Sequence, residues 1–467
     1  MISRLPSLGA AVLLLSACSL APQYQQPATP AGATWQVDTP QAEVPQRDTV
    51  FTDPALQRDT VFTDPALQRL IALALDNNRD LRLAALNVQA FEAQYRISRA
   101  ALVPTLDASL AGSRQRLPAD LSGTGSTAIS SQYSAGIGLS AYELDFFGRI
   151  RSLKDQALEQ YLAEQENRRS AQIGLVSAVA SAYLTLVADR ELLQLSSSTL
   201  HSELQSLALI EQKQRLGVAS ELELAQSRIT VEAARASEAL YQRQVIRDGN
   251  ALAQLLGTPV PLDLAFPASL TEVRIAATPA LAPSQLLQQR PDILAAEHQL
   301  RAANASIGAA RAALFPSISL TTSAGSLSPD LGGLFAGGSG TWLLAPVLNL
   351  PLFDGGQRAA NVDVARTGQE IAVVSYQQTI ETAFREVADS LNTQAQFERQ
   401  LAAQDAQVDA GERYLQLADQ RFEQGVDSYL TRLDAQRSLF SARQQRVSTR
   451  LAELNNRISL YKALGGG

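Results

Sequence analysis

Apolar residues recur at two different periods along the chain, and the change between them predicts its elements. The period-2 alternation of a strand is clearest at Tyr133, Ala135, Ile137, Leu139 and Ala141. Weaker versions occupy residues 106–115 and 317–328, and a fourth strand is expected over 342–352. Pro346 and Pro351 count against that fourth strand, because proline cannot donate a ladder hydrogen bond. Each chain is therefore expected to supply four strands.

Most of the remaining chain follows the helical period and contains few helix breakers. No proline occurs between Pro118 and Pro259 or after Pro351. A helix from Arg149 to Leu216 would extend for roughly 100 Å at 1.5 Å per residue. The last helical stretch repeats apolar residues every seven positions, at Leu433, Phe440, Val447, Leu454 and Tyr461. This heptad pattern predicts partner helices and a left-handed supercoil.

Two short breaks interrupt the helical patterns, at Gly217-Val218 and at Gly425-Val426. Glycine is the usual residue just past a helix end, where the backbone needs a positive φ. Ser220 and Ser428 come after the two breaks and are expected to cap the next helix through a side-chain oxygen. Each break therefore predicts the tip of a long helical hairpin.

The two hairpins belong to a larger internal duplication. Asp80 aligns with Asp292 and Pro104 with Pro316, both at an offset of 212, whereas the tips differ by 208. The sequence thus predicts a first structural repeat over 67–260, a linker over 261–282 and a second repeat over 283–467. In each repeat the expected order is helix, strand, polar loop, strand, long helix, tip and helix.

The N-terminus differs from the rest of the chain. Residues 1–17 have the basic start, short apolar run and small residues of a secretory signal peptide. Residues 18–66 are expected to form an extended arm. Within it, the sequence of 46–56 is repeated without change at 57–67. We expect the extra copy to lie in surface chain and to have no function.

Composition excludes several classes of protein. The net charge of −7 argues against a nucleic-acid-binding surface. With one cysteine and two histidines, the chain has no internal disulfide and no cysteine-based zinc site. His201 and His298 fit no nucleophile–base arrangement, so we expect neither catalytic nor metal-binding residues. No run of 18 apolar residues follows the N-terminus, and no transmembrane helix is expected.

The strands pose a closure problem. Four strands cannot close a barrel, for which about eight is the practical minimum, and lipid does not tolerate the open edges of a sheet. The chain must pool its strands with copies of itself, and a trimer would supply twelve. We therefore predict a mixed α+β membrane protein whose β-barrel is completed by other copies of the same chain.

Specific motifs extend this interpretation to a family. They are Leu-Ser-Ala-Cys at 15–18, the paired Arg-Ala-Ala-Leu-x-Pro motifs at 99–104 and 311–316, Tyr142–Arg149, Leu352–Gly356, both Gly-Val tips and Tyr461–Gly467. Together these motifs resemble those of the outer-membrane efflux lipoproteins, the TolC-like outer membrane factors of the OprM type. The resemblance runs from Cys18 to Gly467. Two departures, the duplicated 46–56 segment and a valine where the family often has tryptophan, affect only the arm.

The resemblance implies a location and a set of partners. Cys18 would become the lipidated first residue of the mature protein, with palmitate among its acyl chains, and no other cofactor is implied. The protein would be a homotrimer in the outer membrane of a Gram-negative bacterium, with a trimeric 12-stranded β-barrel, four strands per chain, that continues into a long periplasmic α-helical barrel. It would serve as the passive exit channel of a tripartite multidrug pump, together with a periplasmic adaptor (membrane fusion) protein and an inner-membrane RND transporter.

A gate and a docking site are also implied. Leu430, Asp434 and Arg437 are spaced i, i+4, i+7 and share one helix face beside the second tip. The resemblance points to this face, with Arg421 nearby, as the periplasmic constriction and its ion pairs. A solvated face with a structural salt bridge is the alternative. Adaptor hairpins would dock at the tips, on Gly217, Val218, Gly425 and Val426.

Other functions stay open on the residues alone. The same fold would suit a duct for protein or metal-ion export. An envelope coiled-coil scaffold without a pore is a further candidate, although it predicts none of the four strands. A hydrolase is disfavoured by the shortage of histidine and cysteine.

Overall fold

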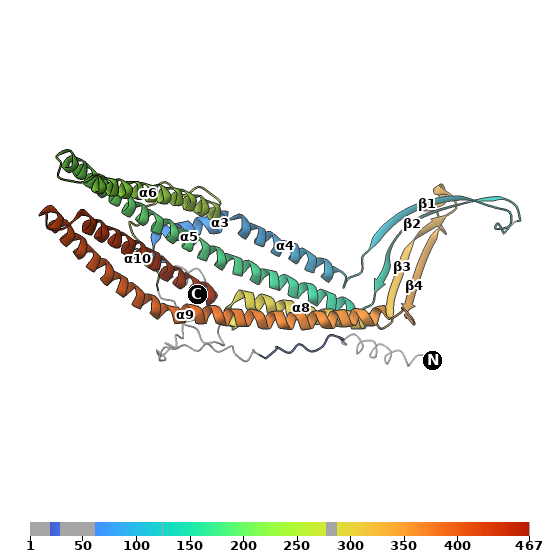
Figure 1. Ribbon diagram of the computed structural model, residues 1–467. Coiled ribbons are helices and arrows are strands. Elements are labelled where there is room, and N and C mark those ends of the chain that lie inside the picture. The colour runs from blue at the N-terminus through green and yellow to red at the C-terminus, as the bar shows by residue number, and fades with distance from the viewer. Residues whose placement is uncertain (1–18, 29–60, 124, 277–286, 467) are drawn as a thin grey trace. The chain divides into compact units, whose positions relative to one another are not determined.

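The computed structural model describes residues 19–28, 61–123, 125–276 and 287–466, in two compact units (Figure 1). The first unit comprises Met1–Ala28, Asn87–Gln165 and Ala295–Tyr376, and contains the strands. The second comprises Thr29–Leu86, Glu166–Leu294 and Gln377–Gly467, and contains both hairpin tips. Each unit is held together by segments from both halves of the sequence.

The first unit contains one four-stranded antiparallel sheet in the order β1-β2-β3-β4. The strands are β1 (Asp107–Leu117), β2 (Ala128–Glu143), β3 (Ser317–Ser328) and β4 (Gly340–Asn349). All four strand predictions are confirmed, and β3 has the predicted bounds. Pro346 pairs with Leu320 within β4, which is an edge strand in the single chain and so tolerates a missing donor. Pro351 lies beyond the strand.

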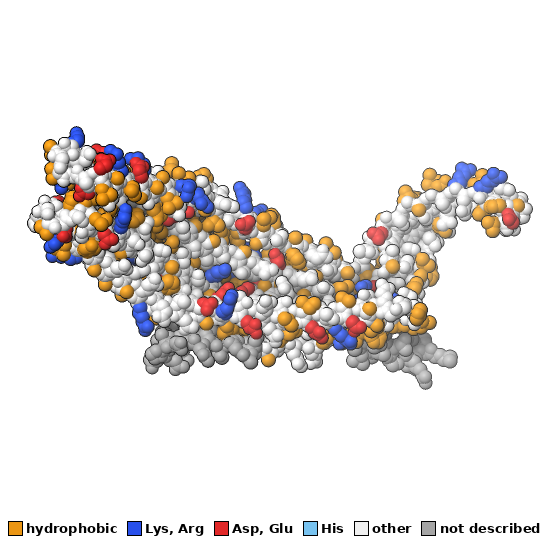
Figure 2. Space-filling view, in the orientation of Figure 1, with side chains coloured by type: hydrophobic (Ala, Val, Ile, Leu, Met, Phe, Trp, Pro, Cys, Tyr) orange, Lys and Arg blue, Asp and Glu red, His pale blue; other side chains and the backbone are white. Residues whose placement is uncertain are grey.

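The register gives the sheet two chemically different faces. Residues paired across neighbouring strands point to the same face of a sheet, as do alternate residues of one strand. Leu110 pairs with Ala135, and Ile137, two residues further along β2, pairs with Ala324, which also pairs with Trp342. These five side chains therefore share one face. The opposite face carries mostly glycine, serine and threonine. In Figure 2 the basic side chains of the sheet gather at its loop end, where β1 carries Arg114 and Arg116. One apolar and one polar face are typical of strands in an outer-membrane barrel.

The chain leaves the sheet through a bulge and a charged corner. The register shifts between Leu139 and Tyr142, and Ala141 between them has a φ of 50°, which is unusual outside glycine. Beyond it, the Arg149 guanidinium donates to the Glu143 carboxylate over 2.8 Å. Phe147 stacks on Phe315, with ring centroids 4.9 Å apart. These contacts fix the direction in which the long helix starts.

The helices match the predicted order. Their bounds are α3 (Pro65–Asn77), α4 (Arg79–Ala100), α5 (Arg149–Arg215), α6 (Glu221–Leu256), α8 (Pro291–Ala312), α9 (Gln357–Glu423) and α10 (Tyr429–Ala463), with a short 3₁₀ turn η1 at Leu331–Gly333. Both α5 and α9 contain 67 residues. The predicted end of α5 is therefore correct to within one residue.

The main core of the second unit lies where α3, α5, α6 and α10 meet. Val447, Leu454, Ile458 and Tyr461 of the predicted heptad pattern are buried in it. Against expectation, α5 includes a stretch apolar and long enough to cross a membrane, but half of that stretch is buried within the chain. Val179, Tyr183 and similar residues make the stretch apolar because they form this core.

The second copy of the tandem repeat is part of the core. Phe62 is fully buried and meets the Tyr461 ring edge-on, with centroids 5.1 Å apart. Asp64 begins α3 by accepting a hydrogen bond from the Ala66 N–H over 2.8 Å, and its other oxygen accepts from the Tyr183 hydroxyl over 2.7 Å. The residues that follow Thr60 in the second copy therefore belong to the core. For this part of the repeat, the expectation of surface chain without a function is wrong. Residues 46–56 lie outside the described residues.

The duplication is visible in how each repeat closes. The Asn78 amide donates to the carbonyl of Leu255 at the end of α6, over 2.9 Å. At the equivalent place in the second repeat, the Arg290 guanidinium donates to the carbonyl of Ala463 at the end of α10, over 3.0 Å. Because the last carbonyls of a helix lack intrahelical donors, both contacts satisfy groups that would otherwise be orphaned.

Candidate gate and hairpin tips

Both hairpin tips are built by the same helix-ending motif. Gly217 and Gly425 have φ values of +73° and +72°, the left-handed conformation that glycine adopts at little cost. The Val218 N–H donates to the Lys213 carbonyl, and the Val426 N–H to the Arg421 carbonyl, each over 2.9 Å. This is the Schellman motif, which satisfies the orphaned carbonyls of α5 and α9. The predicted tips are therefore confirmed as helix ends.

The helices after the two tips begin differently. Ser220 and Glu223 form a reciprocal capping box at the start of α6, as predicted for Ser220. Ser428 stands at the N-cap of α10, but its side chain makes no capping hydrogen bond, so that prediction is wrong. The position equivalent to Glu223 is Thr431, which has no carboxylate to accept a hydrogen bond from the backbone N–H of the N-cap residue. Only the first tip is locked on both sides.

The tips present apolar side chains to solvent. Val218 is 75% exposed and Val426 is 59% exposed, with Leu216 and Leu222 also exposed beside the first tip. A Cβ placed on Gly217 or Gly425 would meet no atom within 4 Å. Positive φ, not lack of space, is the reason for glycine at both positions.

The residues predicted to form the gate lie together on one exposed surface of α10. Leu430 is 57% exposed, and Asp434 and Arg437 are exposed further along the same helix. These three residues form the gate face. On the opposite side of the helix, Tyr429 and Leu433 are buried against Ile210 and Leu224. This apolar cluster holds the start of α10 in the orientation that exposes the gate face.

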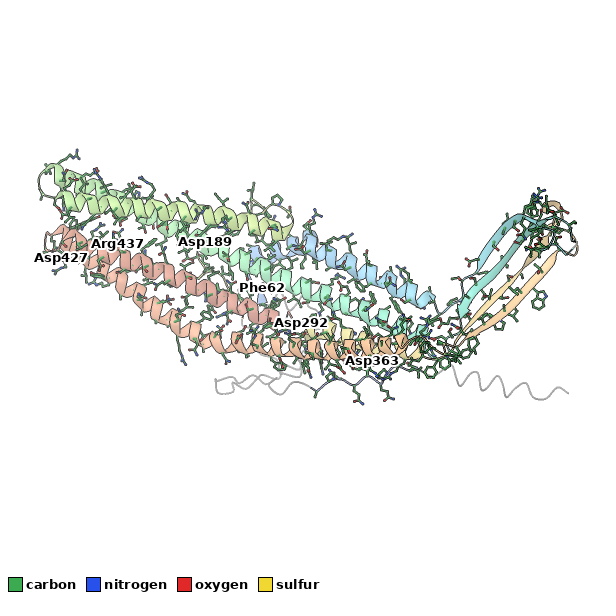
Figure 3. All side chains as sticks on the ribbon, turned by 45° about the vertical axis from the view of Figure 1, so that its right-hand side comes forward. Phe62, Asp189, Asp292, Asp363, Asp427 and Arg437 are labelled. Carbon is green, nitrogen blue, oxygen red and sulfur yellow. The ribbon has the colours of Figure 1, made fainter. Side chains whose placement is uncertain are left out.

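Arg421, the fourth predicted gate residue, has a partner that the sequence did not suggest. Its guanidinium donates to both oxygens of Asp427, over 2.6 and 3.1 Å. Figure 3 shows Asp427 at the tip of the hairpin of α9 and α10. This hydrogen-bonded pair lowers the pKa of Asp427 and raises that of Arg421. Within the described part of the chain, neither Asp434 nor Arg437 belongs to an ion pair. Both are therefore free to meet another copy.

A second contact missed from the sequence ties three helices together near the tips. The Arg432 guanidinium of α10 donates to Asp419 of α9 over 2.5 Å and to the Ser206 hydroxyl of α5 over 2.7 Å. Asp419 and Arg432 are 13 residues apart on opposite arms of a hairpin, and Ser206 belongs to the other hairpin. No local spacing rule connects them, so only the tertiary structure reveals the contact.

Two carboxyl groups face each other between α5 and α6. Burial, followed by the hydrogen bond and the charge of Asp248, raises the pKa of Asp189 to about 7. One oxygen of Asp248 is buried and has no partner among the described residues. The pair therefore holds a proton near neutral pH, because two adjacent carboxylates cannot both ionise freely.

This pair predicts a pH-dependent stability. Because the folded-state pKa of Asp189 is raised, the protonated acid stabilises the fold below about pH 4, and this contribution is lost as pH rises through about 7. We expect Asp248→Asn to reduce the loss of unfolding free energy between about pH 4 and about pH 7 by roughly 1–2 kcal/mol after solvent screening, seen as a smaller fall in the thermal midpoint. Circular dichroism melts of both proteins test this. Parallel pH profiles would contradict it.

In the first unit, the residues just after Cys18 are bound along α8. The Asn304 amide donates to the Pro22 carbonyl over 2.8 Å, and Arg311 donates to the Leu20 carbonyl over 3.3 Å. The Tyr24 hydroxyl donates to Glu297 over 3.1 Å, and burial raises the pKa of Tyr24 to about 12, so it stays a neutral donor. Cys18 itself lies outside the described residues.

The same segment requires a glycine on α8. A Cβ on Gly308 would lie 2.7 Å from the Cβ of Ala21 and 2.7 Å from the Ser152 hydroxyl. Such distances are shorter than any normal contact, so the arm lies against α8 only because position 308 lacks a side chain. The arm after Cys18 is thus a packed element of the first unit.

The residues that the structure describes contain no candidate metal site. There, no group of three or more His, Cys, Asp and Glu side chains is close enough to hold an ion. The largely buried side chain of His298 pairs with Glu159 over 2.6 Å, and the His201 ring lies 3.0 Å from the Gln205 amide nitrogen.

A two-faced sheet, paired long hairpins and a duplicated chain define an outer-membrane channel protein. The family model described as outer membrane efflux protein matches residues 70–258 and again residues 282–466. The chain belongs to this family. Channels of this kind are trimers, and the predicted fold class, with four strands and two helical hairpins per chain, is confirmed. The protein is the outer-membrane exit channel of an efflux pump in a Gram-negative bacterium.

Individual relatives agree along the whole chain. It is 51% identical over 477 aligned residues to the toluene efflux pump outer membrane protein TtgC of Pseudomonas putida, covering 100% of this chain and 96% of the relative. It is 43% identical to the outer membrane protein OprJ of Pseudomonas aeruginosa, covering 99% and 97%. The open state of the MtrE outer membrane channel of Neisseria gonorrhoeae superposes with a TM-score of 0.86 at 38% identity, covering 96% and 98%.

Proposed function

We propose that this protein is a passive channel, gated at its periplasmic tips, in a tripartite multidrug pump. Its partners would be a periplasmic adaptor and an inner-membrane transporter of the RND type, which supplies the energy. The observation that carries the proposal is the gate face, which exposes a carboxylate and a guanidinium that have no ion-pair partner within the described chain. In a trimer, three copies of this face would meet around the axis.

In the closed channel, Asp434 of one copy would pair with Arg437 of the next, with Leu430 narrowing the passage. Opening would move α10 outward and break these pairs. The Arg421–Asp427 pair stabilises the tip itself, since both residues flank the Gly425 turn. Contacts with the adaptor at Val218 and Val426 would supply the free energy for opening, because burying exposed apolar side chains is favourable.

Removing the charges of the gate face tests this role. We expect the double variant Asp434→Ala, Arg437→Ala to have a several-fold higher single-channel conductance in planar bilayers, because the pairs that close the passage are gone. The matched control is Arg443→Ala with Glu412→Ala, an exposed ion pair that joins α9 and α10 away from the gate face. Unchanged conductance of the Asp434 and Arg437 variant would refute the gate.

A lipid anchor at Cys18 is the second part of the proposal. Leu20 is bound at Arg311, close to the start of β3, and Cys18 is two residues away. A lipid on Cys18 would therefore be attached within about 7 Å of this point along the chain. Mass spectrometry of the mature N-terminus should find a diacylglyceryl and acyl mass on Cys18. An unmodified Cys18 would exclude the anchor.

The substrates are proposed to be small hydrophobic toxic compounds. This rests on the name of the relative TtgC, which refers to toluene. The face of the sheet that would line the barrel carries mostly glycine, serine and threonine, so it sets no charge requirement on a substrate. Sensitivity of a strain lacking the gene to solvents and antibiotics, restored by the gene, tests the assignment.

A further inference from the structure

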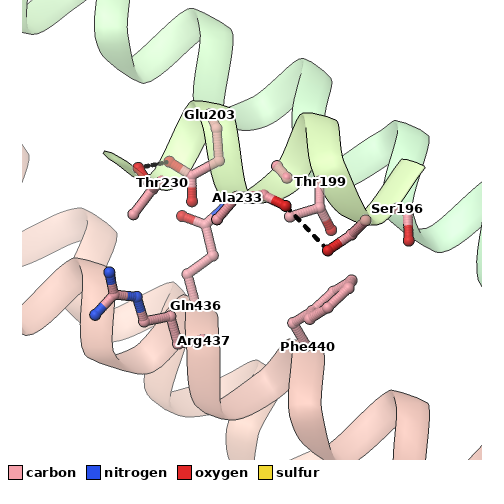
Figure 4. A pocket seen from close by; sticks show the side chains of 10 residues that line it. Ser196, Thr199, Glu203, Thr230, Ala233, Gln436, Arg437 and Phe440 are labelled. Atoms are coloured by element: carbon pink, nitrogen blue, oxygen red, sulfur yellow. Dashed lines mark hydrogen bonds between the residues drawn. The ribbon is translucent and has the colours of Figure 1, made fainter. Parts of the chain in front are cut away.

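A polar cavity lies beside the gate face, where α10 packs against α5 and α6 (Figure 4). Its volume is about 100 Å³. It is lined by Ser196, Thr199, Glu203, Thr230, Ala233, Ala234, Ser237, Gln436, Arg437 and Phe440. Seven of these ten side chains are polar, which is unusual where helices pack. The cavity is thus suited to a polar occupant.

The walls of the cavity carry one buried carboxylate and two buried oxygens that have no hydrogen-bond partner among the described residues. Glu203 is only 3% exposed, and its carboxylate accepts a hydrogen bond from the Thr230 hydroxyl over 3.1 Å. The Ser196 hydroxyl and the side-chain oxygen of Gln436 are both buried and have no partner among the described residues. Buried acceptors without donors are destabilising, and a buried carboxylate more so. The cavity therefore favours a cation that carries several N–H donors.

Arg437 is such a cation, and it already stands at the cavity. It is exposed and has no ion pair within the described residues. Its neighbour Arg432 is not available, since Asp419 and Ser206 hold it. A guanidinium carries five N–H donors and no acceptor, which matches the unsatisfied oxygens of the walls. The cavity, at about 100 Å³, far exceeds the ~10–15 Å³ that one water molecule needs, so it has room for a group as large as a guanidinium.

Electrostatics already links the two groups. Burial raises the pKa of Glu203, whereas the Thr230 hydrogen bond and the charges of Arg432 and Arg437 lower it. The positive charge of Arg437 thus acts on this carboxylate from the edge of the cavity. Moving the Arg437 guanidinium into the cavity would bring its positive charge closer to the Glu203 carboxylate, which is buried without an ion-pair partner among the described residues.

We propose that Arg437 has two alternative partners: Asp434 of a neighbouring copy in the closed channel, and Glu203 of its own chain in the open one. This inference rests on the proposed gate and names the group that holds it open. Opening would then exchange one ion pair for another instead of leaving a bare charge, and the two states would differ by less free energy. Glu203 is a positioning residue that acts through Arg437.

The test uses the full-length trimer in planar bilayers, with Asp434→Ala as the background because that variant favours opening. We expect Glu203→Gln to lower the open probability of this background by roughly fivefold. Glutamine keeps an oxygen that can accept from Thr230, so the helices should stay packed. Glu238→Gln is the matched control, since Glu238 accepts from Ser197 on the same pair of helices. Size-exclusion chromatography confirms that each variant is a trimer.

Arg437→Ala decides between docking and a general structural effect. With Arg437 removed, Glu203→Gln should no longer change the open probability. The charge exchange Glu203→Arg with Arg437→Glu should restore part of the open probability that Glu203→Gln removes. An equal effect of Glu203→Gln in the presence and absence of Arg437, or no effect at all, would overturn the docking site while leaving the gate intact. If Asp434→Ala alone leaves conductance unchanged, the gate itself is wrong.

Discussion

Phe62→Ala should lower the stability of the helical unit by about 3–5 kcal/mol, whereas Phe51→Ala should leave it unchanged. The two phenylalanines have the same neighbours in sequence, because each stands at the same place in one copy of the tandem repeat. Phe62 is fully buried against Tyr461, so truncation removes an aromatic contact and leaves a cavity in the core.

The residues on the C-terminal side of each copy explain why the second copy joins the core. After Leu67, α3 continues with Leu70, Ile71 and Ala74, which are all buried. After the first copy, the equivalent positions are Asp59, Thr60 and Thr63. A helix continued from the first copy would thus place polar groups in the core, which is unfavourable.

Thermal unfolding of the purified trimer, followed by circular dichroism, measures both variants. A single substitution is needed because deletion of either copy gives the same sequence. Equal destabilisation by Phe51→Ala and Phe62→Ala would mean that both copies contact the core, in conflict with the burial of Phe62 against Tyr461.

Arg290→Met should destabilise the second unit by about 3–5 kcal/mol, the range for breaking a buried charge pair. The side chain of Arg290 is 7% exposed and pairs with Asp292 over 2.6 Å and with Glu386 over 2.9 Å. It also donates to the last carbonyl of α10, at Ala463. Its removal would leave two carboxylates and one carbonyl without their shared donor.

The control for Arg290 is Arg69→Met. Arg69 also pairs with an aspartate, Asp263, over 2.8 Å, but both side chains are at least half exposed. Exposed pairs contribute about 0–1 kcal/mol, so this variant should melt close to the unmodified protein. Similar losses for Arg290→Met and Arg69→Met would show that burial of the pair is not what matters.

The features repeated along the sequence were predictable from it. Strand alternation, the absence of proline and the two Gly-Val breaks located the strands, long helices and tips. Each of these is a local pattern with a physical cause in the backbone or in one face of an element. The offset between Asp80 and Asp292 likewise predicted the duplication, which Asn78 and Arg290 now show as equivalent contacts.

Contacts between distant segments were not predictable. Arg432 meets Ser206 across 226 positions, and Phe62 meets Tyr461 across almost the whole chain. The missing cap at Ser428 reflects a partner residue, Thr431, that lacks a carboxylate. Because α5 contains no long unbroken apolar run, the sequence did not predict that this helix is apolar enough to cross a membrane. The apolar residues of this stretch are partly small or aromatic, and they form a core within the chain.

The unequal starts of α6 and α10 have a consequence for the assembled ring. Three chains place six hairpin ends around one opening, of two alternating kinds. The ends with the Ser220–Glu223 box have a reciprocally capped helix start, whereas those that begin at Ser428 lack that cap. Because each chain carries one end of each kind, capped and uncapped ends would alternate around a trimer, and the opening that we expect there has threefold rather than sixfold symmetry.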